Sequence, residues 1–114
     1  MLFRSASARG KVVVFCHQRL DDSAEPRHIV KNAVAIRAVM EKSGKVCAVL
    51  TGHQHCGGYH VLNGIPYYCL RAMVCDSGEG ENSYAVCSVA RNGDFSVEGF
   101  CNASSINRKA GKVK

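Results

Sequence analysis

The chain has 114 residues, 46% of them hydrophobic, and a formal net charge of +6, which suits one small globular domain. No apolar run reaches the ~18 residues that a membrane-spanning helix needs. The N-terminus lacks the apolar segment of a secretory signal, so we expect neither an integral membrane protein with a helical span nor a secreted one.

Lys11–Cys16 is a run of β-branched and aromatic residues that predicts a buried strand ending at His17. A polar stretch from Gln18 to Pro26 predicts a loop. From Arg27 to Lys42 the pattern becomes helical, and Gly44 is suited to end the helix in a left-handed conformation. The apolar residues on one face of this helix would be Ile29, Ala33, Ile36 and Met40.

Lys45–Thr51 predicts a second buried strand. A strand, a helix and a strand in this order form a crossover unit with two parallel strands. His17 and the pair His53 and His55 would then lie just past the carboxyl ends of neighbouring strands. Open α/β sheets bind their ligands at this edge.

The second half of the chain predicts two antiparallel hairpins. Asn63-Gly64 between apolar runs is a strong hairpin signal, because both residues accept a positive φ. The first hairpin would pair Tyr59–Leu62 with Ile65–Leu70, and the second would pair Tyr84–Ala90 with Phe95–Phe100. An acidic, glycine-bearing loop, Cys75–Asn82, joins them. The expected fold class is mixed α/β: one β-α-β unit followed by two antiparallel hairpins.

The ends of the chain are basic. We expect residues 1–10 to be an N-terminal extension, residues 11–101 the folded domain, and residues 102–114 a frayed basic tail. A basic tail can bind nucleic acid, but it lacks the interleaved aromatic residues that stack on bases. The charge also suits a small substrate that carries phosphate.

Seven cysteines are spread along the chain without a CxxC pair, so the usual zinc-ribbon spacing is absent. Most of them lie in apolar runs, where a free cysteine packs as a small hydrophobe. We therefore expect reduced core cysteines and a cytoplasmic location. Only Cys56 lies beside histidines, where it could contact a metal or a substrate.

His17, His53 and His55 are the candidate metal ligands, because neutral imidazole binds Zn, Fe, Mn or Ni well. The alternative is that the His53–His55 segment is a polar turn with no ligand role. We expect His28 to be an exposed residue in the first turn of the helix, and His60 to be a packing residue of a hairpin strand.

Gly52-His53-Gln54-His55 matches GHxH, the last metal motif of the calcineurin-like metallophosphoesterases. The strand that delivers His17 resembles the motif before it in that family. The following Gly57-Gly58-Tyr59, a hairpin, Ala72-Met73-Val74 and Asn82-Ser83-Tyr84-Ala85 look most like the branch of ADP-ribose/CDP-alcohol diphosphatases. The resemblance extends from Lys11 to Phe100.

This resemblance implies a fold of two packed sheets flanked by helices, and a pair of metals that activates a bridging water for attack on phosphorus. By motif, His17 and His53 would bind one metal and His55 the other, with Mn, Fe or Zn as the ions. Cys56, Gly57, Gly58 and Tyr59 would lie near the substrate. The implied activity is hydrolysis of a phosphodiester or of a nucleotide-type pyrophosphate.

The family's earlier motifs, DxH, GDxxxD and GNH, are absent from the chain. The only Gly-Asp pair is Gly93-Asp94 in a hairpin turn, and Asp21 and Asp22 are expected to be solvated. The chain thus resembles the C-terminal half of the fold, and we expect it to bind one metal weakly and to be inactive alone. An exposed apolar face predicts a homo-oligomer or a partner that carries the N-terminal half. The alternatives are a non-catalytic oligomerising or adaptor domain and, less favoured, a basic nucleic-acid-binding module.

Overall fold

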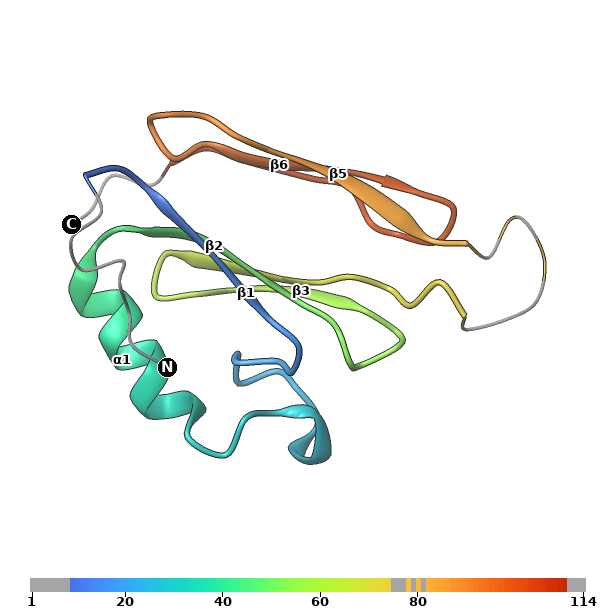
Figure 1. Ribbon diagram of the computed structural model, residues 1–114, viewed down its shortest axis with the longest axis horizontal. Helices are drawn as coiled ribbons and strands as arrows, with labels where there is room; N and C mark the ends of the chain where they lie inside the picture. Colours follow the sequence, from blue (N-terminus) through green and yellow to red (C-terminus); the bar gives the residue numbers. More distant parts are fainter. Residues whose placement is uncertain (1–8, 75–77, 79, 81, 111–114) are drawn as a thin grey trace.

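The computed structural model describes residues 9–74, 78, 80 and 82–110, which form two stacked β-sheets and one α-helix. The helix covers the outer face of the first sheet, and the second sheet lies on its other face (Figure 1). The first sheet contains, in spatial order, β1 (Val12–Cys16), β2 (Val46–Thr51), β4 (Ile65–Cys69) and β3 (Gly58–Leu62). The second contains β5 (Tyr84–Val89), β6 (Phe95–Phe100) and β7 (Ile106–Arg108).

The β1-α1-β2 unit is the predicted parallel crossover. β1 and β2 pair in parallel along their whole length, from Val12↔Val46 to Cys16↔Thr51. The helix α1 (Ala33–Ser43) ends at Gly44, which has the left-handed φ of 63° that the sequence predicts for this position. Among the described residues, no helix is long and apolar enough to cross a membrane.

Both predicted hairpins are present, and the mixed α/β fold class is confirmed. β3 and β4 pair antiparallel around Asn63 and Gly64, whose φ angles are 49° and 81°. β5 and β6 pair antiparallel around a turn that contains Gly93, with a φ of 93°. β4 also pairs in parallel with β2, which joins the first hairpin to the crossover unit.

The core has two layers, one on each face of the first sheet. The layer under the helix includes Val14, Met40, Val49 and Tyr67. The layer between the sheets includes Ala48, Tyr68, Phe95 and Val97. Burial on both faces explains why β2 and β4 are almost continuously apolar.

The predicted start of the helix at Arg27 is wrong. Pro26–His28 forms a short 3₁₀ turn, and Ile29 then becomes extended and pairs in parallel with Arg19. The Arg19 N–H donates to the His28 carbonyl at 3.1 Å, and the Val30 N–H donates to the Arg19 carbonyl at 3.0 Å. These long-range bonds replace the intrahelical bonds that apolar spacing alone would suggest, so the helix begins at Ala33.

The expectation of a frayed tail from Asn102 onward is also wrong for the described residues. Ile106–Arg108 forms β7, the third strand of the second sheet, paired with β6. Arg108 donates to the Gly64 carbonyl at 3.3 Å, and the Ala110 N–H donates to the Asp94 carboxylate at 2.7 Å. Residues 1–8 and 111–114, and the predicted acidic loop at 75–77, 79 and 81, lie outside the described residues.

The expectation of core cysteines is wrong for most of the described ones. Cys69 is buried, whereas Cys56, Cys87 and Cys101 are exposed. Cys87 lies on β5, which forms an edge of the second sheet, and its side chain lines an open space between the two sheets. Cys75 lies outside the described residues.

Candidate metal centre

Three histidines from three separate segments meet at the carboxyl-terminal edge of β1 and β2. The Nε2 atom of His17 lies 3.1 Å from the Nδ1 atom of His53. The ring centres of these two imidazoles are 4.9 Å apart, and those of His28 and His53 are 5.2 Å apart. His53 is therefore the middle ring of the cluster.

A tight turn after β2 holds His53 in place. The Gly52 N–H donates to the His17 carbonyl at 3.0 Å, which ties the turn to the end of β1. The Gln54 N–H donates to the Gly52 carbonyl at 2.7 Å, on the other side of His53. His53 has a φ of 63°, a conformation that non-glycine residues adopt rarely and that often marks functional sites.

The buried side chain of Gln54 connects this turn to the segment that carries His28. Its Oε1 accepts a hydrogen bond from the Glu25 N–H at 3.4 Å, and its Nε2 donates to the Cys56 thiol at 3.3 Å. Together with the Arg19–Ile29 bridge, this bond fixes the 25–29 segment across the histidine turn. The residue between the motif histidines therefore has a structural role.

A buried ion pair lies just beyond β1. Arg19 donates from Nε to one Asp21 carboxylate oxygen at 3.0 Å and from a terminal nitrogen to the other at 2.6 Å. Their side chains are 4% and 1% exposed. The Ser23 hydroxyl donates to the same carboxylate. The expectation that Asp21 is solvated is wrong, because Arg19 and Ser23 satisfy its charge inside the protein.

These contacts decide the ionisation of both groups. Burial acts to raise the pKa of Asp21, but the hydrogen bonds from Arg19 and Ser23 and the positive charge of Arg19 outweigh it and lower the pKa below 3.8. Burial acts to lower the pKa of Arg19, but the hydrogen bond to Asp21 and its charge raise the pKa above the ordinary value of an arginine. Both groups are charged at neutral pH.

Gly57 and Gly58 each have a packing reason to lack a side chain. Gly57 has a φ of 71°, and a Cβ there would lie 3.0 Å from the Cys69 carbonyl oxygen and 3.1 Å from the Arg71 nitrogen. A Cβ on Gly58 would lie 3.0 Å from a guanidinium nitrogen of Arg19. The glycines thus let the loop approach β4 and the buried ion pair.

The other candidates near the substrate are accessible. Cys56 is exposed beside the histidine turn, and Tyr59 on β3 is 39% exposed. His60 lies outside the cluster, where its Nε2 atom is 3.2 Å from the Asp22 carboxylate. It is partly exposed, in accord with a partnered residue of a hairpin strand.

The contact between His17 and His53 fits two ligands of one divalent ion. Ligand nitrogens of a tetrahedral ion are about 3.3 Å apart, close to the observed separation. Desolvation, and then repulsion from His17, His28 and His55, lower the pKa of His53 below 6.5, which favours the neutral form that binds metals. Within the described part of the chain, no three His, Cys, Asp or Glu side chains surround one point as in a formed metal site. Ligation by His55 stays a prediction.

No pattern in the sequence indicates a role for His28. The prediction of an exposed helical residue is wrong: His28 lies in the 3₁₀ turn, its side chain is 18% exposed, and its ring packs edge-on against His53. This location follows from the Arg19–Ile29 bridge, which no local pattern predicts. Glu25, beside it, was likewise part of a predicted loop.

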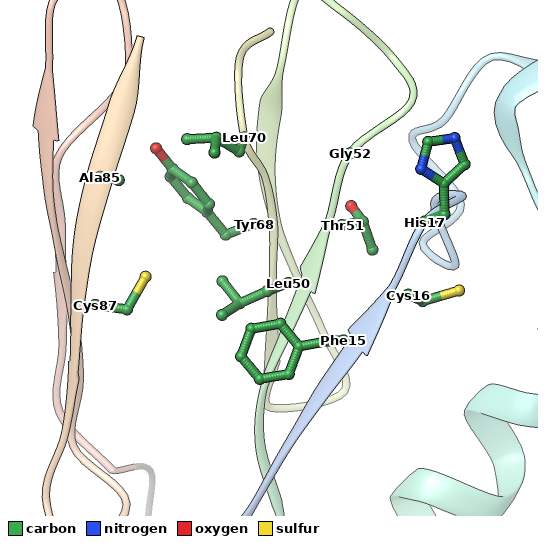
Figure 2. A pocket seen from close by; sticks show the side chains of 10 residues that line it. All are labelled: Phe15, Cys16, His17, Leu50, Thr51, Gly52, Tyr68, Leu70, Ala85 and Cys87. Atoms are coloured by element: carbon green, nitrogen blue, oxygen red, sulfur yellow. The ribbon is translucent and has the colours of Figure 1, made fainter. Parts of the chain in front are cut away.

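An apolar cleft of about 510 Å³ lies between the two sheets, next to this cluster. Figure 2 shows Phe15, Leu50 and Tyr68 of the first sheet pointing toward β5, with Ala85 and Cys87 opposite them. His17 and Gly52 border the cleft at one end. Phe15 is 70% exposed, so the cleft is open to solvent beside the candidate ligands.

Comparison with known proteins gives a structural match. No protein-family model and no curated protein matches the sequence. The structure is similar to the crystal structure of a dimetal phosphatase from Danio rerio, with a TM-score of 0.77 and 18% sequence identity over 89% of this chain. The chain spans about a third of the length of that protein, 32%. The chain therefore shares its fold with part of that dimetal phosphatase, in agreement with the two-sheet fold that the resemblance implied.

Proposed function

We propose that this chain is the metal-binding part of a metal-dependent phosphoesterase or pyrophosphohydrolase. Its substrate would be a phosphodiester or a nucleotide-type pyrophosphate. The observation that supports this most directly is the 3.1 Å contact between His17 and His53, at the carboxyl ends of two parallel strands. The likeness of the fold to a dimetal phosphatase agrees with it.

In this proposal His17 and His53 bind one divalent ion, Mn, Fe or Zn, and His55 binds the other. A bound divalent ion supplies a Lewis acid for phosphoryl oxygens and lowers the pKa of a water that acts as nucleophile. The turn at Gly52 and Gln54 orients His53 toward His17. Cys56, Gly57, Gly58 and Tyr59 border the place of the substrate.

The chain by itself is proposed to be inactive. It lacks the DxH, GDxxxD and GNH motifs, and with them the bridging carboxylate and the histidine that would assist the leaving group. Two dications held by neutral imidazoles alone would repel each other without compensating anions. Hydrolysis in this proposal therefore needs an N-terminal half that supplies the missing groups.

The open side of the sandwich supports a protein partner. Among the described strands, β1 pairs only with β2 and β5 only with β6, so each sheet has an unpaired edge. The apolar cleft joins these edges, since Phe15 comes from β1, and Ala85 and Cys87 come from β5. Unpaired edges beside an apolar cleft are typical of an interface. We propose a partner that carries the N-terminal half or, alternatively, a second copy of this chain, in the cytoplasm, where free thiols persist.

Metal analysis of the purified chain tests the proposal. The wild type should bind a stoichiometric amount of Mn or Zn, and His53→Ala should abolish uptake, whereas His60→Ala should not. A phosphodiesterase assay with added Mn should give activity only with an N-terminal half supplied in trans. Absence of metal uptake by the wild-type chain would refute the proposal.

The second candidate function is a non-catalytic oligomerising or adaptor domain that retains the fold. The combination of missing motifs and an open apolar cleft favours it. It predicts concentration-dependent association in light scattering without metal uptake. A monomer at all concentrations that binds metal would rule out this alternative.

A further inference from the structure

His28 lies where a further metal ligand would lie. Two imidazoles that share one tetrahedral ion have ring centres about 5 Å apart. The observed separations are 4.9 Å for His17 and His53 and 5.2 Å for His28 and His53. His53 thus has two histidine neighbours at co-ligand distance.

Glu25 is placed to orient the His28 ring. Its Oε2 atom lies 3.3 Å from the Nδ1 atom of His28. That Nδ1 atom is buried and makes no well-aligned hydrogen bond to any described residue. Histidines that bind metals usually donate this second ring N–H to a carboxylate, which leaves Nε2 as the ligand nitrogen. Arg27 competes for the carboxylate at 3.2 Å, but its side chain is 80% exposed.

The space beside these groups can admit a cation. A cavity of about 370 Å³ is lined by Glu25, Arg27, His28, His53, Gln54, His55 and Cys56. His17 borders the neighbouring cleft and reaches this group through its contact with His53. Leaving out Arg27 and Gln54, five lining residues are of types that bind divalent metals. Glu25 also supplies the negative charge that a set of neutral imidazoles lacks.

The backbone holds His28 at this cavity before any ion binds. The Arg19 N–H donates to the His28 carbonyl at 3.1 Å, and the Glu25 N–H donates to Gln54 at 3.4 Å. The described side chains do not yet surround one point, so binding requires rotation of an imidazole; His53 is exposed.

We infer that His28, oriented by Glu25, is a ligand of the divalent cation that His17 and His53 bind. This inference rests on the proposed function, because it assumes that the cation binds at His53. It adds a residue to the ligand set implied by motif, in which His17 and His53 bind this ion and His55 binds the other. His28 is thus the third imidazole of the ion at His17 and His53.

Titration of the full chain with Co²⁺ and Zn²⁺ tests the inference, with affinity measured by competition against a coloured chelator. His28→Gln should weaken binding at least tenfold and change the visible Co²⁺ spectrum. Glu25→Gln should weaken binding about 10- to 100-fold through the second ring nitrogen. His60→Gln is the matched control and should leave the affinity unchanged.

The outcomes separate the two proposals. If His28→Gln binds like the wild type while His53→Gln loses the metal, the inference is wrong and the proposed function stands. If the wild type binds no metal, both are wrong. Should His28→Gln fail to fold, NMR of the wild type decides: Co²⁺ must shift or broaden the His28 ring signals together with those of His17 and His53, and unshifted His28 signals would overturn the inference.

Discussion

Replacing Asp21 by Asn tests the importance of the buried ion pair. The substitution keeps the shape of the side chain but removes the charge that faces Arg19, whose side chain is 4% exposed. Two hydrogen bonds, at 3.0 and 2.6 Å, are then lost or weakened, and the guanidinium stays buried without a counterion. Breaking a buried pair by removing one partner costs about 3–5 kcal/mol.

This cost is a large share of the free energy of unfolding, which for a small domain is about 5–15 kcal/mol. At a few degrees per kcal/mol, we expect Asp21→Asn to lower the Tm by roughly 10–20 °C. The assay is thermal and urea unfolding at pH 7, followed by circular dichroism.

Two further variants complete the test. Asp22→Asn is the matched control, because its carboxylate is 56% exposed and its pair with His60 should contribute at most about 1 kcal/mol. Replacing both members by apolar residues, Arg19→Met with Asp21→Leu, should restore most of the lost stability. The reasoning would be refuted if Asp21→Asn cost less than about 1 kcal/mol, or if the double variant were less stable than the single one.

The pKa of Asp21 is lowered below 3.8, so its carboxylate stabilises the folded state fully above that pH, and this stabilisation is lost as the pH falls through the folded-state pKa. We therefore expect the urea concentration at the unfolding midpoint to decrease when the pH is lowered below about 4. The decrease should be smaller in the apolar double variant. Equal drops in the two proteins would contradict this. Tyr67→Phe should leave stability unchanged or raise it by about 1 kcal/mol, since its buried hydroxyl, with a pKa raised to about 12 by burial, has no hydrogen-bond partner among the described residues. Tyr68→Phe removes a 2.8 Å hydrogen bond to the Ser104 carbonyl and should instead lower the free energy of unfolding by about 1 kcal/mol. If calorimetry found Tyr67→Phe less stable than Tyr68→Phe, these hydrogen-bond roles of the two hydroxyls would be wrong. Gly99→Ala should lose more than about 2 kcal/mol, because a Cβ there overlaps the carbonyl oxygens of Ala103 and Ser104, whereas Gly10→Ala, with open space around it, should be near neutral in urea unfolding. A fully stable Gly99→Ala would show that the 102–105 segment can move away from β6.

Local sequence determined the strands β1 to β6, both hairpins and the edge at which the site forms. Apolar β-branched runs predict strands, and Asn63 and Gly64 accept the positive φ angles that their turn requires. Once β1 and β2 are parallel, the residues that follow them must meet at one edge of the sheet. The closeness of His17 and His53 is a direct consequence, and it could be predicted from the order of the elements.

Only the tertiary structure decided which groups join them. His28 reaches His53 because residues 28–30 bond to the backbone of Arg19, and Asp21 is buried because Arg19 faces it. β7 exists because β6 offers it an edge. Residue periodicity encodes bonds within one helix or one hairpin, whereas these contacts depend on segments brought together by the rest of the fold. The pairing of His17 with His53 can therefore be predicted from the sequence, whereas the groups packed around this pair cannot.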